Sequence, residues 1–118
     1  MNVETIRDYC LTFAGVTEEF PFGPENLVFK VAGKMFLLVS LDTGDTFNAK
    51  CDPEKAIQPR EEYDEVQPGY HMNKTHWNTV LFTGRLTDAQ LKEMISHSYE
   101  LVKASLPKKM RDELNTVK

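Results

Sequence analysis

Residues 35–41, with the sequence MFLLVSL, are apolar at every position but one, and this run decides the fold. A short apolar run of this kind is typical of a strand in the middle of a sheet. Residues 27–32 form a second strand-like run, and residues 46–51 alternate between apolar and polar side chains. Glycine-containing turns at residues 33–34 and 42–45 separate the three runs, so the sequence predicts a three-stranded antiparallel meander.

The chain before the meander predicts one helix and then a loop. Asn2 can cap the helix, and four apolar residues follow at helical spacing: Val3, Ile6, Cys10 and Phe13. Gly15 is placed to end that helix. Residues 16–26 contain two prolines and a glycine, so we expect them to form a loop.

The chain after the meander predicts a short helix and two more strands. Residues 52–54, Asp-Pro-Glu, have the capping acid and the early proline of a helix start. Pro59 is expected to end this helix soon afterwards, and the acidic residues 61–65 are expected to form a loop. Strands are predicted at residues 66–70 and 77–83.

The longest predicted helix starts at a capping box, Thr87-Asp-Ala-Gln90. It carries an apolar stripe that must cover a sheet: Leu91, Met94, Ile95, Tyr99, Val102 and Leu106. Pro107 interrupts it before a last amphipathic turn or two. The order of elements predicts an α+β fold, a two-layer sandwich in which an antiparallel sheet of about five strands has N- and C-terminal helices packed on one face. We expect residues 1–118 to form a single domain.

Composition and charge narrow the class of protein. The chain has 118 residues, 41% of them hydrophobic and 27% charged, which is typical of a globular protein. It contains no apolar run long enough to span a bilayer and no export signal, so we expect a cytoplasmic protein with Cys10 and Cys51 reduced. The net charge is −4, and residues 1–65 carry thirteen acids against six Lys or Arg. Residues 66–118 carry five acids against eight, so only this half would tolerate an anionic partner.

The segment at residues 68–80, PGYHMNKTHWNTV, holds the densest polar and aromatic chemistry of the chain. His71 and His76 are five residues apart, a spacing that points the two rings to opposite faces of a strand and away from one face of a helix. We therefore expect no metal site, and the alternative is that the histidines hydrogen-bond within their own turn, which Asn73 caps. Trp77 opens a strand, where it is either an anchor at the rim of the core or part of a contact surface.

Two other residues that could carry chemistry, His97 and Cys51, are predicted to have structural roles. His97 has Glu93 and Glu100 nearby on its helix, which predicts a surface ion pair. Cys51 lies beside Asp52, an acid that raises a thiol pKa, and its strand phase points inward. No serine or glycine pattern matches a known catalytic motif. The sequence therefore predicts neither a catalytic residue nor a cofactor, and it favours a protein that is not an enzyme.

The segment at residues 68–80 also resembles the MmcQ/YjbR family of small bacterial proteins. The other elements of the resemblance, in the same order and at near-identical spacing, are Phe22-Gly23 and residues 33–36, 52–54 and 98–102. The string H-x-N-K-x-H-W at residues 71–77 is its most distinctive part. The resemblance covers essentially the whole chain, and it implies a frataxin-type (CyaY-like) fold and an intracellular bacterial protein. The resemblance implies no catalytic residue.

The resemblance also implies a place to look for a partner. A DNA-binding role through two hairpins, called a double wing, has been proposed for some members of the family. The matching positions here are Lys34, His71, Asn73, Lys74, His76, Trp77, Asn78 and Arg85. The acidic composition departs from that of a general DNA binder, so any DNA complex is expected to be weak and salt-sensitive. The alternative is recognition of a protein or small molecule with no nucleic-acid role, and in both cases we expect a monomer with no membrane partner.

Overall fold

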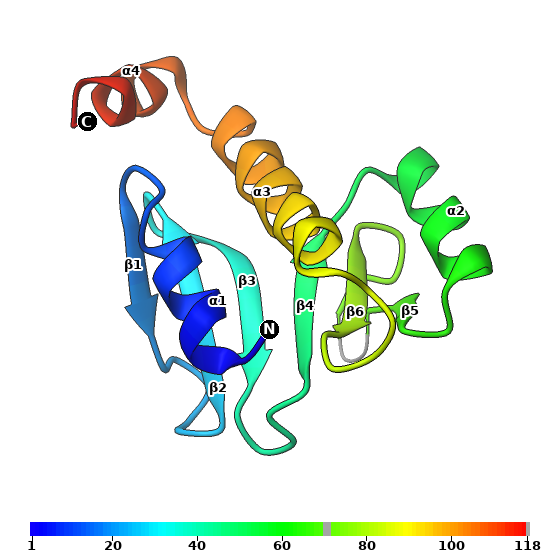
Figure 1. Ribbon diagram of the computed structural model, residues 1–118. Coiled ribbons are helices and arrows are strands. Elements are labelled where there is room, and N and C mark those ends of the chain that lie inside the picture. The colour runs from blue at the N-terminus through cyan, green and yellow to red at the C-terminus, as the bar shows by residue number, and fades with distance from the viewer. Residues whose placement is uncertain (70–71, 118) are drawn as a thin grey trace.

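The computed structural model describes residues 1–69 and 72–117, with side chains as far as residue 114. It contains a six-stranded antiparallel sheet in the order β1-β2-β3-β4-β6-β5, with helices packed against it (Figure 1). The strands are β1 (Val16–Glu19), β2 (Asn26–Val31), β3 (Lys34–Ser40), β4 (Thr46–Lys50), β5 (Val66–Pro68) and β6 (Trp77–Leu81). The helices are α1 (Val3–Cys10), α2 (Pro53–Glu62), α3 (Asp88–Ala104) and α4 (Lys108–Val117). The predicted α+β fold is therefore confirmed.

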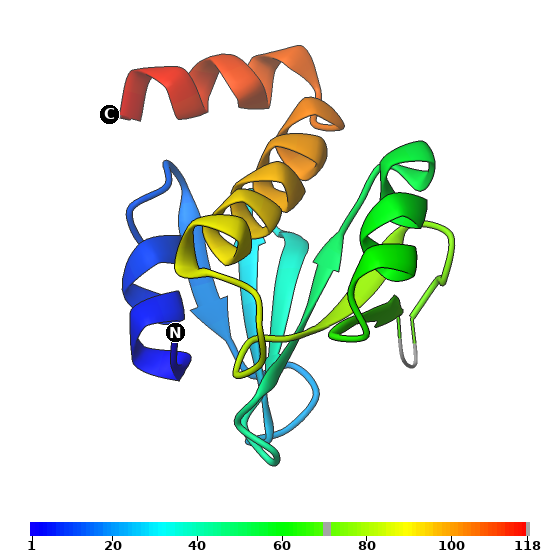
Figure 2. The same ribbon diagram turned by 45° about the vertical axis from the view of Figure 1, so that its right-hand side comes forward.

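The four helices lie on one side of the sheet, as the two views in Figures 1 and 2 agree. The core between the layers is built from strand residues such as Phe29, Phe36 and Phe47 and from the predicted stripe of α3. Five of the six stripe residues are buried, and Met94 is partly buried. Within residues 1–69 and 72–117, no helix is long and apolar enough to cross a membrane.

The sixth strand, β1, corrects the prediction that residues 16–26 form only a loop. β1 pairs with β2 over four residues, from Val16 opposite Val31 to Glu19 opposite Val28. Its charged side chains are matched by neighbours: Arg7 on α1 binds Glu18 at 2.6 Å, and Lys30 lies 3.5 Å from Glu19. The prolines and the glycine that predicted a loop come after β1, so the strand has formed before they interrupt it.

The helix α1 ends at Cys10, before the predicted stop at Gly15. Phe13 is thus outside the helix, but its ring still reaches the core, stacked on Tyr99 with the ring centroids 4.6 Å apart. Gly15 has a φ of +73°, a left-handed conformation that suits glycine. A Cβ added there would lie 2.1 Å from Cδ2 of Leu114, so α4 packs closely over this turn.

The helix α2 runs through Pro59 to Glu62, which corrects the prediction that Pro59 ends it. Proline inside a helix lacks the N–H that would bond the carbonyl four residues earlier, a loss of about 3 kcal/mol. The last turn is held instead by Arg60, whose guanidinium donates to Asn78 Oδ1 at 2.7 Å and to the carbonyl of Lys74 at 2.6 Å. Charged hydrogen bonds contribute about 1.5–3 kcal/mol each, enough to offset the proline.

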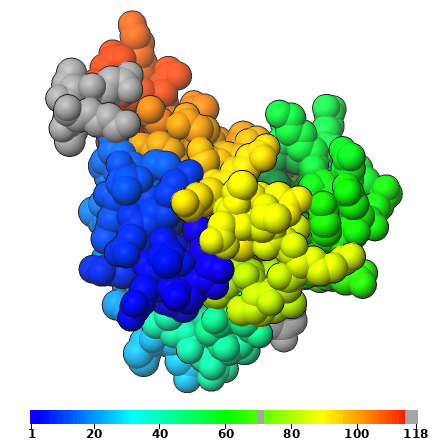
Figure 3. Space-filling view, viewed as in Figure 1, coloured from blue at the N-terminus to red at the C-terminus, as the bar shows by residue number. Residues whose placement is uncertain are grey.

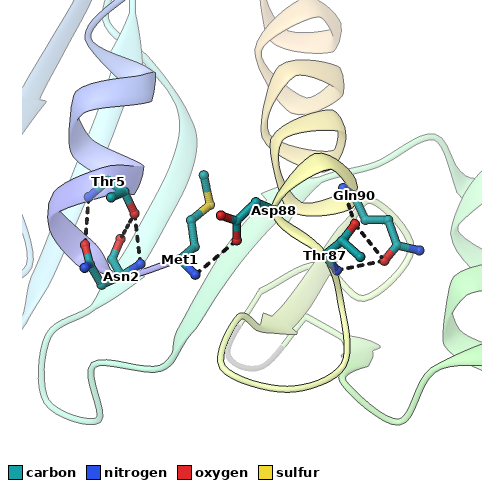
Figure 4. Close-up of polar contacts among 6 residues, drawn as sticks. All are labelled: Met1, Asn2, Thr5, Thr87, Asp88 and Gln90. Atoms are coloured by element: carbon teal, nitrogen blue, oxygen red, sulfur yellow. Dashed lines mark hydrogen bonds and ion pairs between the residues drawn. The ribbon is translucent and has the colours of Figure 1, made fainter.

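The ends of α1 and α3 meet beside the sheet (Figure 4). Both predicted caps are present: Asn2 accepts from the Thr5 N–H at 2.9 Å, and Thr87 and Gln90 form the predicted capping box. The N-terminal ammonium of Met1 lies 3.1 Å from a carboxylate oxygen of Asp88 in the first turn of α3. Acidic groups are favoured at that position because the helix dipole is positive there.

The helix α3 also hydrogen-bonds to the backbone of the sheet through Ser98, which is fully buried. The Ser98 hydroxyl accepts a hydrogen bond from the N–H of Lys50 at 2.8 Å and donates to the carbonyl of Phe36. The paired residues of β3 and β4 end one step earlier, at Leu37 and Ala49. One side chain thus completes the ladder between the two central strands.

Candidate functional site

The segment that carries most of the predicted site is a hydrogen-bonded turn before β6. Asn73 Oδ1 accepts from the backbone N–H of Thr75 at 2.9 Å and of His76 at 3.3 Å, which confirms the predicted cap. Lys74 Nζ donates to the carbonyl of Gly69 at 3.0 Å and so closes the turn. His71 lies outside the described residues.

Arg60 on α2 holds the turn through hydrogen bonds. Arg60 donates to the carbonyl of Trp77 at 3.2 Å, in addition to its bonds to Asn78 and Lys74. Asn78 is only 7% exposed, so its amide is part of this anchor and faces the helices. Sequence reasoning did not single out Arg60, because no local pattern links a residue of α2 to a strand eighteen positions later.

The outer side of the turn is open to solvent. The side chains of Asn73, Lys74, Thr75 and His76 are exposed, and Trp77 is half-buried. A polar tip held on a rigid base is a favourable arrangement for binding, because less conformational freedom is lost when a partner is bound.

Trp77 and Lys50 are register partners on β6 and β4. Their neighbours Asn78 and Ala49 are buried toward the helices, so Trp77 and Lys50 point to the opposite face of the sheet. No helix of the described chain lies on that face (Figures 1 and 2). Lys34 is exposed at the start of β3, at the same end of the antiparallel sheet.

Arg85 does not join this group. It follows β6, at the other end of that strand, and its guanidinium binds Glu65 through two bonds of 3.0 and 3.1 Å. Its backbone N–H also donates to Glu65 at 2.7 Å. These hydrogen bonds, first those from the side chain and then that from the backbone, lower the pKa of Glu65 to about 2.

The thiols are not activated. Burial raises the pKa of Cys10 to about 12. Burial also raises the pKa of Cys51, and Arg60 offsets part of this effect. Arg60 is a cationic neighbour that the sequence did not reveal, but it does not reverse the direction. Thiols with raised pKa values are poor nucleophiles, so both cysteines are core residues.

The prediction that His97 forms a surface ion pair is wrong. It is half-buried on α3, and its Nε2 is buried with no hydrogen-bond partner among the described residues. It lines a groove between α2 and α3. One signal in the sequence could have placed it: Met94, a member of the apolar stripe, is three residues earlier on the same flank.

Within residues 1–69 and 72–117, no three His, Cys, Asp or Glu side chains come close enough together to hold a metal ion. The arrangement of the described residues thus contains a hydrogen-bonded exposed turn, an aromatic–lysine register pair on the open sheet face and a groove between α2 and α3.

Known proteins match the chain over most of its length. The YjbR family model matches residues 11–101. The uncharacterised protein YbdF of Escherichia coli O157:H7 is 40% identical over 107 residues, covering 90% of this chain and 88% of that protein. The uncharacterised protein YjbR of Escherichia coli K12 is 28% identical over 112 residues, covering 94% and 95% of the two chains.

Solved structures agree with the fold. The crystal structure of Deinococcus radiodurans protein DR2400, a DUF419 domain, superposes with a TM-score of 0.89 at 33% identity, covering 97% of this chain and 88% of that one. A crystal structure of a Pseudomonas syringae protein superposes with a TM-score of 0.73 at 26% identity, covering 86% and 98%. With the family model matching most of the chain, and with the fold and the anchored turn described above, this protein belongs to the YjbR family.

Proposed function

We propose that the protein is a non-enzymatic binding module whose contact surface is the outer side of residues 73–77 together with Lys50 and Lys34. We call this the Trp77–Lys50 surface. The observation that carries the proposal is the pairing of Trp77 with Lys50 on the sheet face that no helix of the described chain covers. Residues that pack neither a core nor a helix, on a base held by Arg60, are available for recognition.

Nucleic acid is the proposed partner, in a weak complex. An aromatic ring stacks on bases of any sequence, and a neighbouring lysine neutralises phosphate, as in proteins that bind single strands. Lys34 and Lys50 are two such lysines at one end of the sheet, and Lys74 adds a third whose ammonium also bonds Gly69. Few contacts predict low affinity, and because those contacts are with phosphates the complex is expected to weaken as salt rises. Arg85 is left out because Glu65 occupies its guanidinium.

A protein partner is the second candidate, favoured by the apolar character of part of the same face. Leu38 on β3 and Thr79 on β6 are both register partners of Asn48 on β4. All three side chains are partly exposed on this face. With Trp77 they form a surface of mixed polarity, as protein interfaces have.

An NMR titration separates these candidates. Single-stranded and duplex oligonucleotides are added at low and at moderate salt, and backbone amide shifts are followed. The expected result is shifts confined to Lys34, Lys50 and residues 73–78 that fade as salt rises. Lys50→Gln should reduce them, whereas Lys108→Gln, an exposed lysine on α4, should not. An absence of shifts at low salt would exclude the nucleic-acid version and leave the protein partner to be tested.

A further inference from the structure

A groove lies between α2 and α3 (Figure 3). Its outer part has a volume of about 680 Å³ and leads to an inner recess of about 70 Å³ over β4 and β6. Four residues line both parts: Lys55, Pro59, Met94 and His97. The recess far exceeds the 10–15 Å³ that a single water requires, so it has room for a chemical group of several atoms.

His97 supplies the polar atom at the junction. Its Nε2 is buried, and no described residue hydrogen-bonds to it. A buried polar atom without a partner is unfavourable by about 1–3 kcal/mol, and most buried polar atoms in proteins are satisfied. His97 lines both the recess and the outer groove, so a turn of its ring that exposes Nε2 would let a molecule in the groove supply that partner.

Charge is distributed unevenly along the groove. None of the residues lining the recess is acidic, and Lys55 lines it from the first turn of α2. The acids Glu62 and Glu93 line only the outer part. The inner end therefore favours an anion and the outer end disfavours one.

Apolar groups complete the walls. Met94 and Pro59 lie on opposite sides, on α3 and α2, and Val80 lies on the strand beneath. A thioether and a proline ring pack well against a flat or aliphatic body, and methionine sulfur contacts aromatic rings favourably. Binding pockets commonly combine such walls with a few placed polar groups.

We infer that the groove binds a small organic carboxylate, whose anionic group lies between Lys55 and His97 and whose apolar body packs between Pro59 and Met94. No bond is made or broken. Lys50 lines the recess and also belongs to the Trp77–Lys50 surface, but the groove itself lies on the helix side of the sheet.

The test uses benzoate, with benzamide as an uncharged probe of the same shape and inorganic phosphate as a purely inorganic anion. Amide and methyl shifts of the full chain are followed by NMR. Benzoate is expected to shift signals of Lys55, Met94 and His97 and to leave residues 73–77 unchanged. Benzamide should bind about tenfold more weakly or worse, the size of one lost charged hydrogen bond.

Two variants and a control assign the contact. Lys55→Gln, at an exposed position, should weaken benzoate binding by about tenfold without affecting folding. His97→Leu should weaken it similarly, and Lys92→Gln, an exposed lysine on α3 outside the groove, should leave it unchanged. Equal binding of benzoate and benzamide, binding of phosphate alone, or no shifts in the groove would each overturn the assignment.

Discussion

Arg60 Nε donates to Asn78 Oδ1 across 2.7 Å, and this bond joins the last turn of α2 to the second residue of β6. The same guanidinium reaches the carbonyls of Lys74 and Trp77, so one side chain fixes the turn, the strand and the helix end together. Asn78 is buried, and its amide oxygen would be unsatisfied without Arg60.

Arg60→Lys is therefore expected to destabilise the protein by about 2 kcal/mol, because an ammonium cannot reproduce the fork that binds three acceptors. Urea unfolding followed by circular dichroism measures the change. Arg7→Lys is the control, since Arg7 binds the partly exposed Glu18 and should contribute less than about 1 kcal/mol. Equal losses in the two variants would contradict an anchoring role for Arg60.

Ser98→Ala should be more damaging, at about 2–4 kcal/mol, because it leaves both the Lys50 N–H and the Phe36 carbonyl without their partner inside the core. The measurement is the free energy of unfolding in urea. Ser105→Ala, which removes a hydroxyl that donates to the Val102 carbonyl at the exposed end of α3, is expected to change it by about 1 kcal/mol or less. A loss for Ser98→Ala as small as that of the control would mean that the two strands do not depend on this bridge.

Gly15→Ala and Gly44→Ala form a matched pair. Both glycines have a left-handed φ, +73° and +68°, so alanine is strained by about 1 kcal/mol at either site. Only at Gly15 does the new methyl group also meet Leu114, which should add about 1–3 kcal/mol. In a Leu114→Ala background the two substitutions should have similar effects on thermal unfolding. A difference that persists there would place its cause elsewhere than the contact with α4.

Stability should depend on the charge of Glu65. The Arg85 hydrogen bonds hold its folded-state pKa at about 2, below its ordinary value of 4.5. A lowered folded-state pKa contributes stability above pH 4.5, and this contribution is lost as the pH falls toward 2. The melting temperature of Glu65→Gln should thus lie below that of the wild type at pH 7, with the gap closing between these pH values. Glu62→Gln, at an exposed position, is the control. A pH-dependent difference in melting temperature of the same size in that variant would contradict a contribution of the Glu65–Arg85 pair.

The sequence predicted the features that local chemistry determines. The apolar run at residues 35–41 is a central strand, the stripe of α3 is buried, and the caps at Asn2, Asn73 and Thr87 are present. Each of these depends on residues within a few positions of one another, so the pattern and the structure coincide.

Features that depend on distant partners were not predicted. β1 is a strand because it pairs with β2, and α2 continues past Pro59 because Arg60 bonds to residues 74–78. His97 is half-buried because it faces α2 across the groove, so its predicted surface ion pair was wrong for the same reason, a partner distant in the sequence. The anchored turn of the candidate site could be placed from sequence, but neither its anchor nor the groove could.

The contacts between the two ends of the chain have a consequence for its synthesis. The Tyr99 hydroxyl donates to the Ala14 carbonyl at 2.7 Å across 85 positions, and Met1 reaches Asp88 across 87. A chain that emerges from the ribosome N-terminus first would therefore complete β2, β3 and β4 well before α3 exists to cover Phe29, Phe36 and Phe47. A translational pause before residue 88 would leave these three rings exposed to chaperones and to other nascent chains.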